Sequence, residues 1–141
     1  MARKDELLSH LTEVPLFSKC SRRDLTAVTS HLELLALHEG AQIVSQGQAG
    51  DAFYVLLEGR AVVRRNGRKV GELGAGDYFG ELAVLDPAPR NADVVALTDV
   101  EVARLDAGSF RKMLRSVPAM NERLLAGLSR RVRDADRKSV E

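Results

Sequence analysis

Residues 53–73, Phe-Tyr-Val-Leu-Leu-Glu-Gly-Arg-Ala-Val-Val-Arg-Arg-Asn-Gly-Arg-Lys-Val-Gly-Glu-Leu, decide the fold class. Three β-rich runs, Phe53 to Leu57, Ala61 to Arg65 and Lys69 to Leu73, are separated by turns that contain glycine. Asn66-Gly67 is a strong hairpin signal, because both central positions of such a two-residue turn need positive φ. The stretch therefore predicts short antiparallel strands joined by tight turns.

The sequence on both sides extends this pattern. Further strands are predicted at Leu34 to Leu37, Gln42 to Ser45, Asp93 to Leu97 and Val100 to Leu105, with an interruption after Leu73. A parallel sheet would need crossover helices between the strands, and none fits here. Short strands at this spacing favour an antiparallel, jelly-roll-like β-barrel, a mainly β fold with flanking helices.

Helical periodicity marks both ends of the chain. From Lys4 to Leu32 the apolar residues fall at helical intervals, with a break at Val14-Pro15, because proline disfavours a helical residue before it. Ser21 followed by Asp24 resembles a capping box. Two short N-terminal helices with a kinked joint are predicted; their apolar residues are Leu7, Leu8, Leu11, Leu25, Val28 and Thr29.

Near the C-terminus, Pro118 divides a short helix, about Ser109 to Val117, from a longer one that runs to about Arg137. One face of the longer helix is apolar and needs a partner, which is the barrel, a ligand or a second copy of the chain. That face consists of Leu125, Leu128, Val132 and Ala135.

Composition sets the limits on function. The 141 residues suit one domain, and a net charge of +1 gives no general reason to expect nucleic acid or an anionic membrane as partner. The single Cys20 indicates a reducing compartment. Met1 to Glu13 lacks the apolar core of a secretion signal, and Ala52 to Leu57 is far shorter than the ~20 residues of a membrane span. A cytoplasmic domain is predicted.

Residues 76–94, Gly-Asp-Tyr-Phe-Gly-Glu-Leu-Ala-Val-Leu-Asp-Pro-Ala-Pro-Arg-Asn-Ala-Asp-Val, do not follow the strand pattern. Gly80 allows a sharp turn, and Glu81 to Leu85 suit a single helical turn whose free N–H groups form an anion cradle. Arg90 can fork onto phosphate oxygens, whereas the Glu81 carboxylate repels phosphate and suits sugar hydroxyls. Together these residue types describe a site for a nucleotide with one phosphate.

Phe79 to Leu85, followed by Pro89 to Val94, resembles the phosphate-binding cassette of the cyclic nucleotide-binding domain family. That family includes the bacterial catabolite activator and the regulatory subunits of cyclic-AMP-dependent kinase. The resemblance extends over nearly the whole chain. It implies a single domain, 1–141, with N-terminal helices in 1–31, a β-barrel in 32–105 that includes the cassette at 79–94, and C-terminal helices in 106–141.

The resemblance also implies roles for individual residues. Glu81 would take the ribose 2′-hydroxyl, Arg90 would pair with the cyclic phosphate, and backbone N–H groups near Gly80 and Ala83 would complete the cradle. Leu82 would couple the cassette to the C-terminal helix. The strand positions that would line the sugar and base are Val63, Val70 and Gly71.

Three positions depart from the family pattern. Asn91 follows the arginine where cyclic-AMP binders often carry Ala or Ser and cyclic-GMP binders favour Thr. Because an amide can bond either base edge, the choice between cyclic AMP and cyclic GMP stays open, with cyclic AMP as the leading prediction. Ala135 and Asp136 stand where the bacterial activators carry a Thr-Ser pair. Within residues 1–141 no helix-turn-helix, kinase-docking segment or pore is expected.

Several other functions are disfavoured. His10, His31 and His38 lack the spacing of metal ligands, so neither a metal site nor a metal-dependent enzyme is predicted. No nucleophile–base pair supports hydrolysis. Cys20 is interpreted as structural or incidental, and the arginines of the C-terminal helix as a solvated face. An exposed ion pair between Glu81 and Arg90 is the alternative to their roles in a binding site.

The leading hypothesis is a non-catalytic cyclic-nucleotide receptor that signals to a downstream protein by moving its C-terminal helix. One alternative is a nucleotide-independent module with a degenerate pocket that forms a homodimer through Leu125, Leu128 and Val132. Another is the sensor part of a longer transcription regulator.

Overall fold

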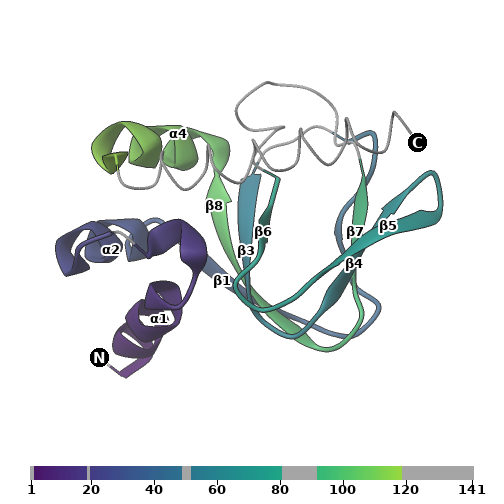
Figure 1. Ribbon diagram of the computed structural model, residues 1–141, viewed down its shortest axis with the longest axis horizontal. Helices are drawn as coiled ribbons and strands as arrows, with labels where there is room; N and C mark the ends of the chain where they lie inside the picture. The colour runs from purple at the N-terminus through teal and green to yellow at the C-terminus, as the bar shows by residue number, and fades with distance from the viewer. Residues whose placement is uncertain (1, 19, 49–51, 81–91, 119–141) are drawn as a thin grey trace.

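The computed structural model describes residues 2–18, 20–48, 52–80 and 92–118. Helices lie at both ends of this part of the chain, with strands between them (Figure 1). No helix in these ranges is long and apolar enough to cross a membrane. The elements are α1 (Ala2–Thr12), the 3-10 helix η1 (Pro15–Phe17), α2 (Arg22–Thr29), β1 (Glu33–Leu37), β2 (Gln42–Val44), β3 (Ala52–Glu58), β4 (Ala61–Arg65), β5 (Arg68–Leu73), β6 (Tyr78–Phe79), β7 (Asp93–Ala96), β8 (Val100–Asp106) and α4 (Ala107–Ser116).

The strands form two four-stranded antiparallel sheets, as the sequence predicts for a jelly-roll-like barrel. One sheet has the order β1-β8-β3-β6 and the other β2-β7-β4-β5. Helices α1, α2 and α4 lie beside the first sheet, and β4 and β5 extend away from them on the other side (Figure 1). The chain passes from the first sheet to the second between β6 and β7, which is the segment that carries the predicted cassette.

Strand β3 lies between two apolar cores, which explains its unbroken apolar sequence. Phe53, Val55 and Leu57 belong to the core shared with the helices, whereas Tyr54 and Leu56 belong to the core between the sheets. Successive side chains of a strand point to opposite faces, so a strand covered on both faces buries every residue. All of Ala52 to Leu57 is buried.

The N-terminal helices pack as predicted, with Leu7, Leu11, Leu25 and Val28 buried. The kinked joint is η1, and the capping box is confirmed: Ser21 Oγ accepts from the Asp24 N–H, and the Asp24 carboxylate accepts from the Ser21 N–H. The partly buried Cys20 packs against this core, and burial, with a smaller effect from Asp24, raises the pKa of its thiol.

Helix α4 is fixed at its start and along its buried face. The Asp106 side chain caps the helix by accepting from the Ser109 N–H at 2.9 Å. Phe110 is fully buried and stacks on Phe53, with ring centroids 4.4 Å apart. The sequence predicts this helix two residues late, at Ser109, because Ala107 and Gly108 carry no apolar periodicity.

The remaining elements partly follow the predictions. The hairpin turn is confirmed, since Asn66 and Gly67 have φ of 54° and 79°. The interpretation that residues 76–94 do not follow the strand pattern is wrong for Tyr78–Phe79, which form β6. Strands β2 and β7 also end one residue earlier than predicted, at Val44 and Ala96. The predicted helix to Arg137, with Leu125, Leu128, Val132, Ala135 and Asp136, lies outside the described residues.

Candidate functional site

The residues with the most specific predicted roles lie in a part of the chain that the structure does not describe. These are Glu81, Leu82, Ala83, Arg90 and Asn91, together with the predicted helical turn from Glu81 to Leu85. The structure does describe both ends of this segment and the strands that face the space between the sheets. The candidate site is therefore built from Gly80, β6, β7 and the β4–β5 hairpin.

Gly80 ends the first sheet and begins the segment. Its φ of 92° lies in the left-handed region, where a residue with a Cβ is strained, which agrees with the backbone freedom expected at Gly80. Just before it, Phe79 is buried between the sheets and stacks on Tyr54, with centroids 5.1 Å apart and ring planes at 9°. Phe79 and Tyr54 are also paired across β6 and β3. The segment thus begins from an anchored residue.

The turn before β6 is held by backbone hydrogen bonds to β3. The Leu56 N–H donates to the Asp77 carbonyl oxygen, and the Gly76 N–H donates to the Leu56 carbonyl oxygen, both at 2.8 Å. The Asp77 carboxylate closes the turn by accepting from the Gly74 N–H at 2.7 Å. These bonds compensate for the short length of β6, which has only two residues.

The other end of the segment is fixed by β7. Ala92 and Val94 are buried, and Asp93 Oδ1 accepts from the Gln46 N–H at 2.7 Å and from Gln42 Nε2 at 3.0 Å. No local pattern in the sequence indicates this role for Asp93, because its partners lie 47 and 51 residues away along the chain. Sequence reasoning missed the residue for that reason.

Val63 and Gly71 form an open patch of the inner wall. Val63 lies between Gly71 on β5 and Val94 on β7 in the strand register, and it is only partly buried against the core between the sheets. Among the described residues, no atom lies within 4 Å of the position that a Cβ on Gly71 would take. A small apolar side chain beside a bare backbone leaves room for a flat ligand group.

Val70 is placed differently from its two predicted neighbours. The pairing of β4 with β5 shifts between Val63 and Arg64, and Val70 lies at this irregularity without a register partner. Its relative exposure is 44%, and it belongs to neither buried core. The structure thus brings Val63 and Gly71 together on one patch, with Val70 at its margin.

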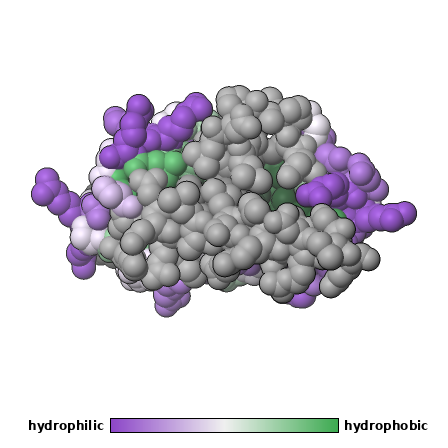
Figure 2. All heavy atoms as spheres, turned by 45° about the horizontal axis from the view of Figure 1, so that its top comes forward, coloured by the Kyte–Doolittle hydropathy of each residue, from purple (hydrophilic) through white to green (hydrophobic). Residues whose placement is uncertain are grey.

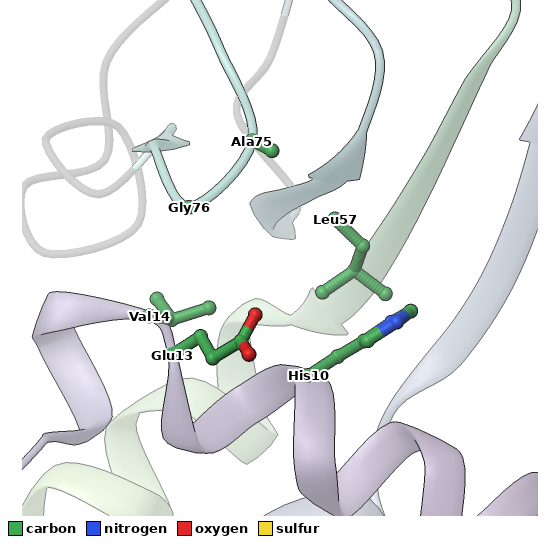
Figure 3. Close-up of a pocket in the computed structure, with 6 residues that line it drawn as sticks. All are labelled: His10, Glu13, Val14, Leu57, Ala75 and Gly76. Atoms are coloured by element: carbon green, nitrogen blue, oxygen red, sulfur yellow. The ribbon is translucent and has the colours of Figure 1, made fainter.

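The structure also contains a cavity of about 200 Å³ on the helix side of β3. His10 from α1, Glu13 from the turn after it and Leu57 from β3 line it, beneath the backbone of Ala75 and Gly76 (Figure 3). Leu57 belongs to the core shared with the helices, so this cavity lies across β3 from the Val63–Gly71 patch. His10 Nε2 lies 4.0 Å from Glu58 Oε1. In the described ranges, no cluster of side chains is suited to a metal ion.

In the described part of the chain, two antiparallel sheets enclose an apolar core, with open space beside Gly71. Residues 34–117 match the sequence model of the cyclic nucleotide-binding domain. The match covers more than half of the chain, and the chain belongs to this family. The resemblance inferred from the cassette residues is confirmed.

Known relatives agree with this assignment. The chain is 42% identical over 106 residues to the cAMP-dependent protein kinase regulatory subunit of Aspergillus niger. The aligned region covers 74% of this chain and 26% of that protein. The regulatory domain of Toxoplasma gondii PKA, solved with cAMP, superposes with a TM-score of 0.80 at 32% identity, over 92% of this chain and 51% of that one. The chain spans about a quarter of the length of the curated relatives it matches.

A third relative belongs to a kinase described as cAMP-independent. The regulatory subunit of a cAMP-independent protein kinase A from Trypanosoma brucei superposes with a TM-score of 0.78 at 31% identity, over 87% of this chain and 47% of that one. These relatives are regulatory proteins and not enzymes, in agreement with the prediction of a non-catalytic binding domain.

Proposed function

We propose that this chain is a cytoplasmic cyclic-nucleotide receptor domain, spanning 1–141, that binds cyclic AMP. The observation that carries the proposal is the open patch at Val63 and Gly71, which faces the space between the sheets in a chain of this family. A purine base is flat, and a wall formed by a bare glycine backbone and a partly exposed valine suits its face. The cAMP-bound Toxoplasma gondii domain is a supporting comparison.

The proposed contacts to the nucleotide are a charged contact with its phosphate and hydrogen bonds to its phosphate and ribose. Arg90 would bind the cyclic phosphate through its planar guanidinium, which donates two parallel hydrogen bonds to phosphate oxygens. Backbone N–H groups near Gly80 and Ala83 would donate to the same phosphate, and the Glu81 carboxylate would accept from the ribose 2′-hydroxyl. Val70 would extend the apolar wall at its exposed margin, and Asn91 would contribute to the choice of base.

We further propose that the domain signals by moving its C-terminal helix toward the site, with Leu82 transmitting the change from the cassette. Ligand binding can shift such an equilibrium only by the difference in affinity between the two states. A shift from 1:99 to 99:1 requires about 5.5 kcal/mol. An unidentified downstream protein would read the change.

Calorimetric titration with cyclic AMP and cyclic GMP tests the binding proposal. Replacing Arg90 by Ala would leave a desolvated phosphate without its charged partner, so Arg90→Ala should weaken cyclic-AMP binding by on the order of 2–5 kcal/mol. Arg90→Lys keeps the charge but not the paired donors and should lie between the two. Arg22→Ala, an exposed arginine on α2, is the matched control and should bind as the wild type does. Equal affinity of Arg90→Ala and the wild type would exclude the proposed role.

The second candidate is a nucleotide-independent module that dimerises through its C-terminal helix. The likeness to the Trypanosoma brucei subunit of a cAMP-independent kinase favours it. In that case, light scattering would give a dimer whose mass and thermal stability do not change with cyclic nucleotide. A true ligand at 100 times its Kd instead adds about 2.7 kcal/mol to the free energy of unfolding, so a rise in Tm with cyclic AMP argues against this candidate.

A further inference from the structure

The β4–β5 hairpin concentrates positive charge on one end of the molecule. Residues 60–73 carry a net charge of +4, against +1 for the whole chain, and contain one acidic residue, Glu72. Figure 2 shows hydrophilic side chains gathered at the end of the molecule where Figure 1 places this hairpin, away from the helices. The cationic residues, all exposed, are Arg60, Arg64, Arg65, Arg68 and Lys69.

The strand register places these charges directly opposite one another. Arg64 pairs with Lys69, and Arg65 pairs with Arg68 across the turn. Like charges at directly opposed positions destabilise a hairpin. Two such pairs in succession are therefore unfavourable for folding, and they indicate a use that compensates for this cost.

Glu72, the acidic residue of the hairpin, lies within ion-pair distance of two of these cations. The Glu72 carboxylate lies 2.9 Å from Lys69 Nζ and 3.4 Å from Arg60 Nη1. Within the described ranges, neither Arg64 nor Arg68 has a carboxylate in ion-pair distance. Both guanidinium groups remain available to an acidic partner.

The hairpin tip is hydrogen-bonded to Gln46. Gln46 Oε1 accepts from the Asn66 N–H at 2.8 Å, and Gln46 Nε2 donates to Asn66 Oδ1 at 2.9 Å. The Gln46 N–H is in turn bonded to Asp93. A surface held in place before binding loses less conformational entropy when a partner docks.

Strand β5 is also an edge of its sheet. In the described part of the chain it pairs with β4 alone, so its other side presents backbone groups that an added strand could use. Val70 on this strand is the one large apolar residue classed as exposed among the described residues. Pairing with the same edge of a second copy would bring like charges together. Positively charged residues on an edge strand prevent such edge-to-edge association. An acidic strand would meet no such repulsion.

We propose that the β5 edge and the cationic tip form a docking surface for an extended acidic segment of a partner protein. The segment would add beside β5 as a strand, with carboxylates toward Arg64 and Arg68 and an apolar side chain on Val70. Nucleic acid fits less well, because residues 60–73 contain no aromatic side chain on which bases could stack. The proposal does not depend on nucleotide binding.

The test uses the full chain and a fluorescein-labelled peptide that alternates glutamate and valine. Reversing two charges in the Arg64→Glu/Arg68→Glu variant should weaken peptide binding at least about tenfold. The matched control Arg22→Glu/Arg23→Glu changes the same charge on α2 and should alter binding less than about twofold. The same peptide with alternate backbone nitrogens methylated cannot pair as a strand, and it should also bind more weakly.

Folding of the variant is measured separately. Arg68→Glu replaces repulsion of Arg65 with attraction, so the urea midpoint of the double variant should not fall below that of the wild type. Arg64→Gln/Arg68→Gln, which only removes charge, should lose binding as well. Undiminished affinity in either folded variant would overturn the proposal, as would equal affinity of the methylated peptide. Tighter binding of duplex DNA or phosphatidylserine vesicles, lost in the same variants, would favour those partners and overturn it too.

Discussion

Asp93 Oδ1 accepts a hydrogen bond of 2.7 Å from the backbone N–H of Gln46. The bond joins the first residue of β7 to the loop that holds the hairpin tip through Asn66. Asp93 stands three positions after Arg90, so the same contact fixes the point at which the chain leaves the cassette. The polar contacts of a single loop residue, Gln46, thus connect two regions to which we assign different partners.

Replacing Asp93 by Ala should leave the Gln46 N–H and Gln42 Nε2 without their shared acceptor. A buried or part-buried donor that loses its partner costs about 1–3 kcal/mol, and urea unfolding would measure this loss. Asp93→Asn keeps one acceptor oxygen and should lose less. Gln42→Ala, which removes only the exposed side-chain bond, should stay within about 0.5 kcal/mol of the wild type. A loss for Asp93→Ala no larger than for Gln42→Ala would show that the backbone bond does not hold β7.

Alanine substitutions at Gly59 and Gly40 distinguish the effect of backbone strain on stability from the effect of a steric clash. Both have φ near +90°, but a Cβ on Gly59 would meet the Asp99 carbonyl oxygen and would lie 2.7 Å from Thr98 Oγ1, whereas one on Gly40 would meet no described atom within 4 Å. Gly40→Ala should therefore lose about 1 kcal/mol from backbone strain. Gly59→Ala adds the contact and should lose about 2–4 kcal/mol in urea unfolding. Equal losses in the two variants would contradict the close approach of Gly59 to Thr98 and Asp99.

Phe79 and Phe110 are buried aromatic residues on opposite sides of the first sheet. Truncation of either to Ala should lower the free energy of unfolding by about 3–5 kcal/mol. Phe79 adjoins Gly80 and stacks on Tyr54, so Phe79→Ala should also weaken cyclic-AMP binding at temperatures where both variants are folded. Phe110→Ala is the control for a general loss of stability. Equal affinity of the two variants would remove Phe79 from the support of the site.

Asp106 predicts a specific dependence on pH. Hydrogen bonds from the Ser109 backbone N–H and hydroxyl hold the pKa of the Asp106 carboxyl below its ordinary value of 3.8. Because folding lowers this pKa, the cap stabilises the protein at higher pH, and the contribution is lost as pH falls below about 4. Asp106→Ala should cost about 0.5–1 kcal/mol at pH 7, the lower part of the range for helix caps because the carboxylate is exposed. The difference between variant and wild type should shrink at pH 3.

Carboxyl-carbon NMR provides the direct measurement of that pKa. The Asp106 pKa should lie below 3.8 in the wild type and rise in Ser109→Ala, which retains the backbone donor but not the hydroxyl. An Asp106 pKa that is unchanged by the substitution would mean that the hydroxyl bond is absent in solution.

Local signals in the sequence predict much of this fold. The Asn66-Gly67 turn, the strands beside it and the Ser21–Asp24 capping box depend on residues close together in the chain, and the structure confirms them. Strand β6 was missed because its two residues become a strand only through pairing with Tyr54 and Val55 of β3. Pairing partners so distant in sequence leave no periodic pattern to detect.

In the candidate site, too, features that depend on local sequence could be predicted, and features that depend on distant contacts could not. The positive φ at Gly80 follows from the conformational freedom of glycine and could be predicted. The roles of Gln46 and Asp93 could not, because their contact joins residues far apart in the chain. The assignments of Glu81 and Arg90 stay predictions, since both lie outside the described residues.

The central claim is that the space beside Gly71 receives a cyclic nucleotide. Titration of the ¹⁵N-labelled chain with cyclic AMP, followed residue by residue, tests it most directly. The backbone signals of Val63, Gly71 and Gly80 should shift and saturate together, while that of Gly40 stays in place. Saturable shifts confined to the cavity beside His10, or none at millimolar nucleotide, would contradict a receptor site between the sheets.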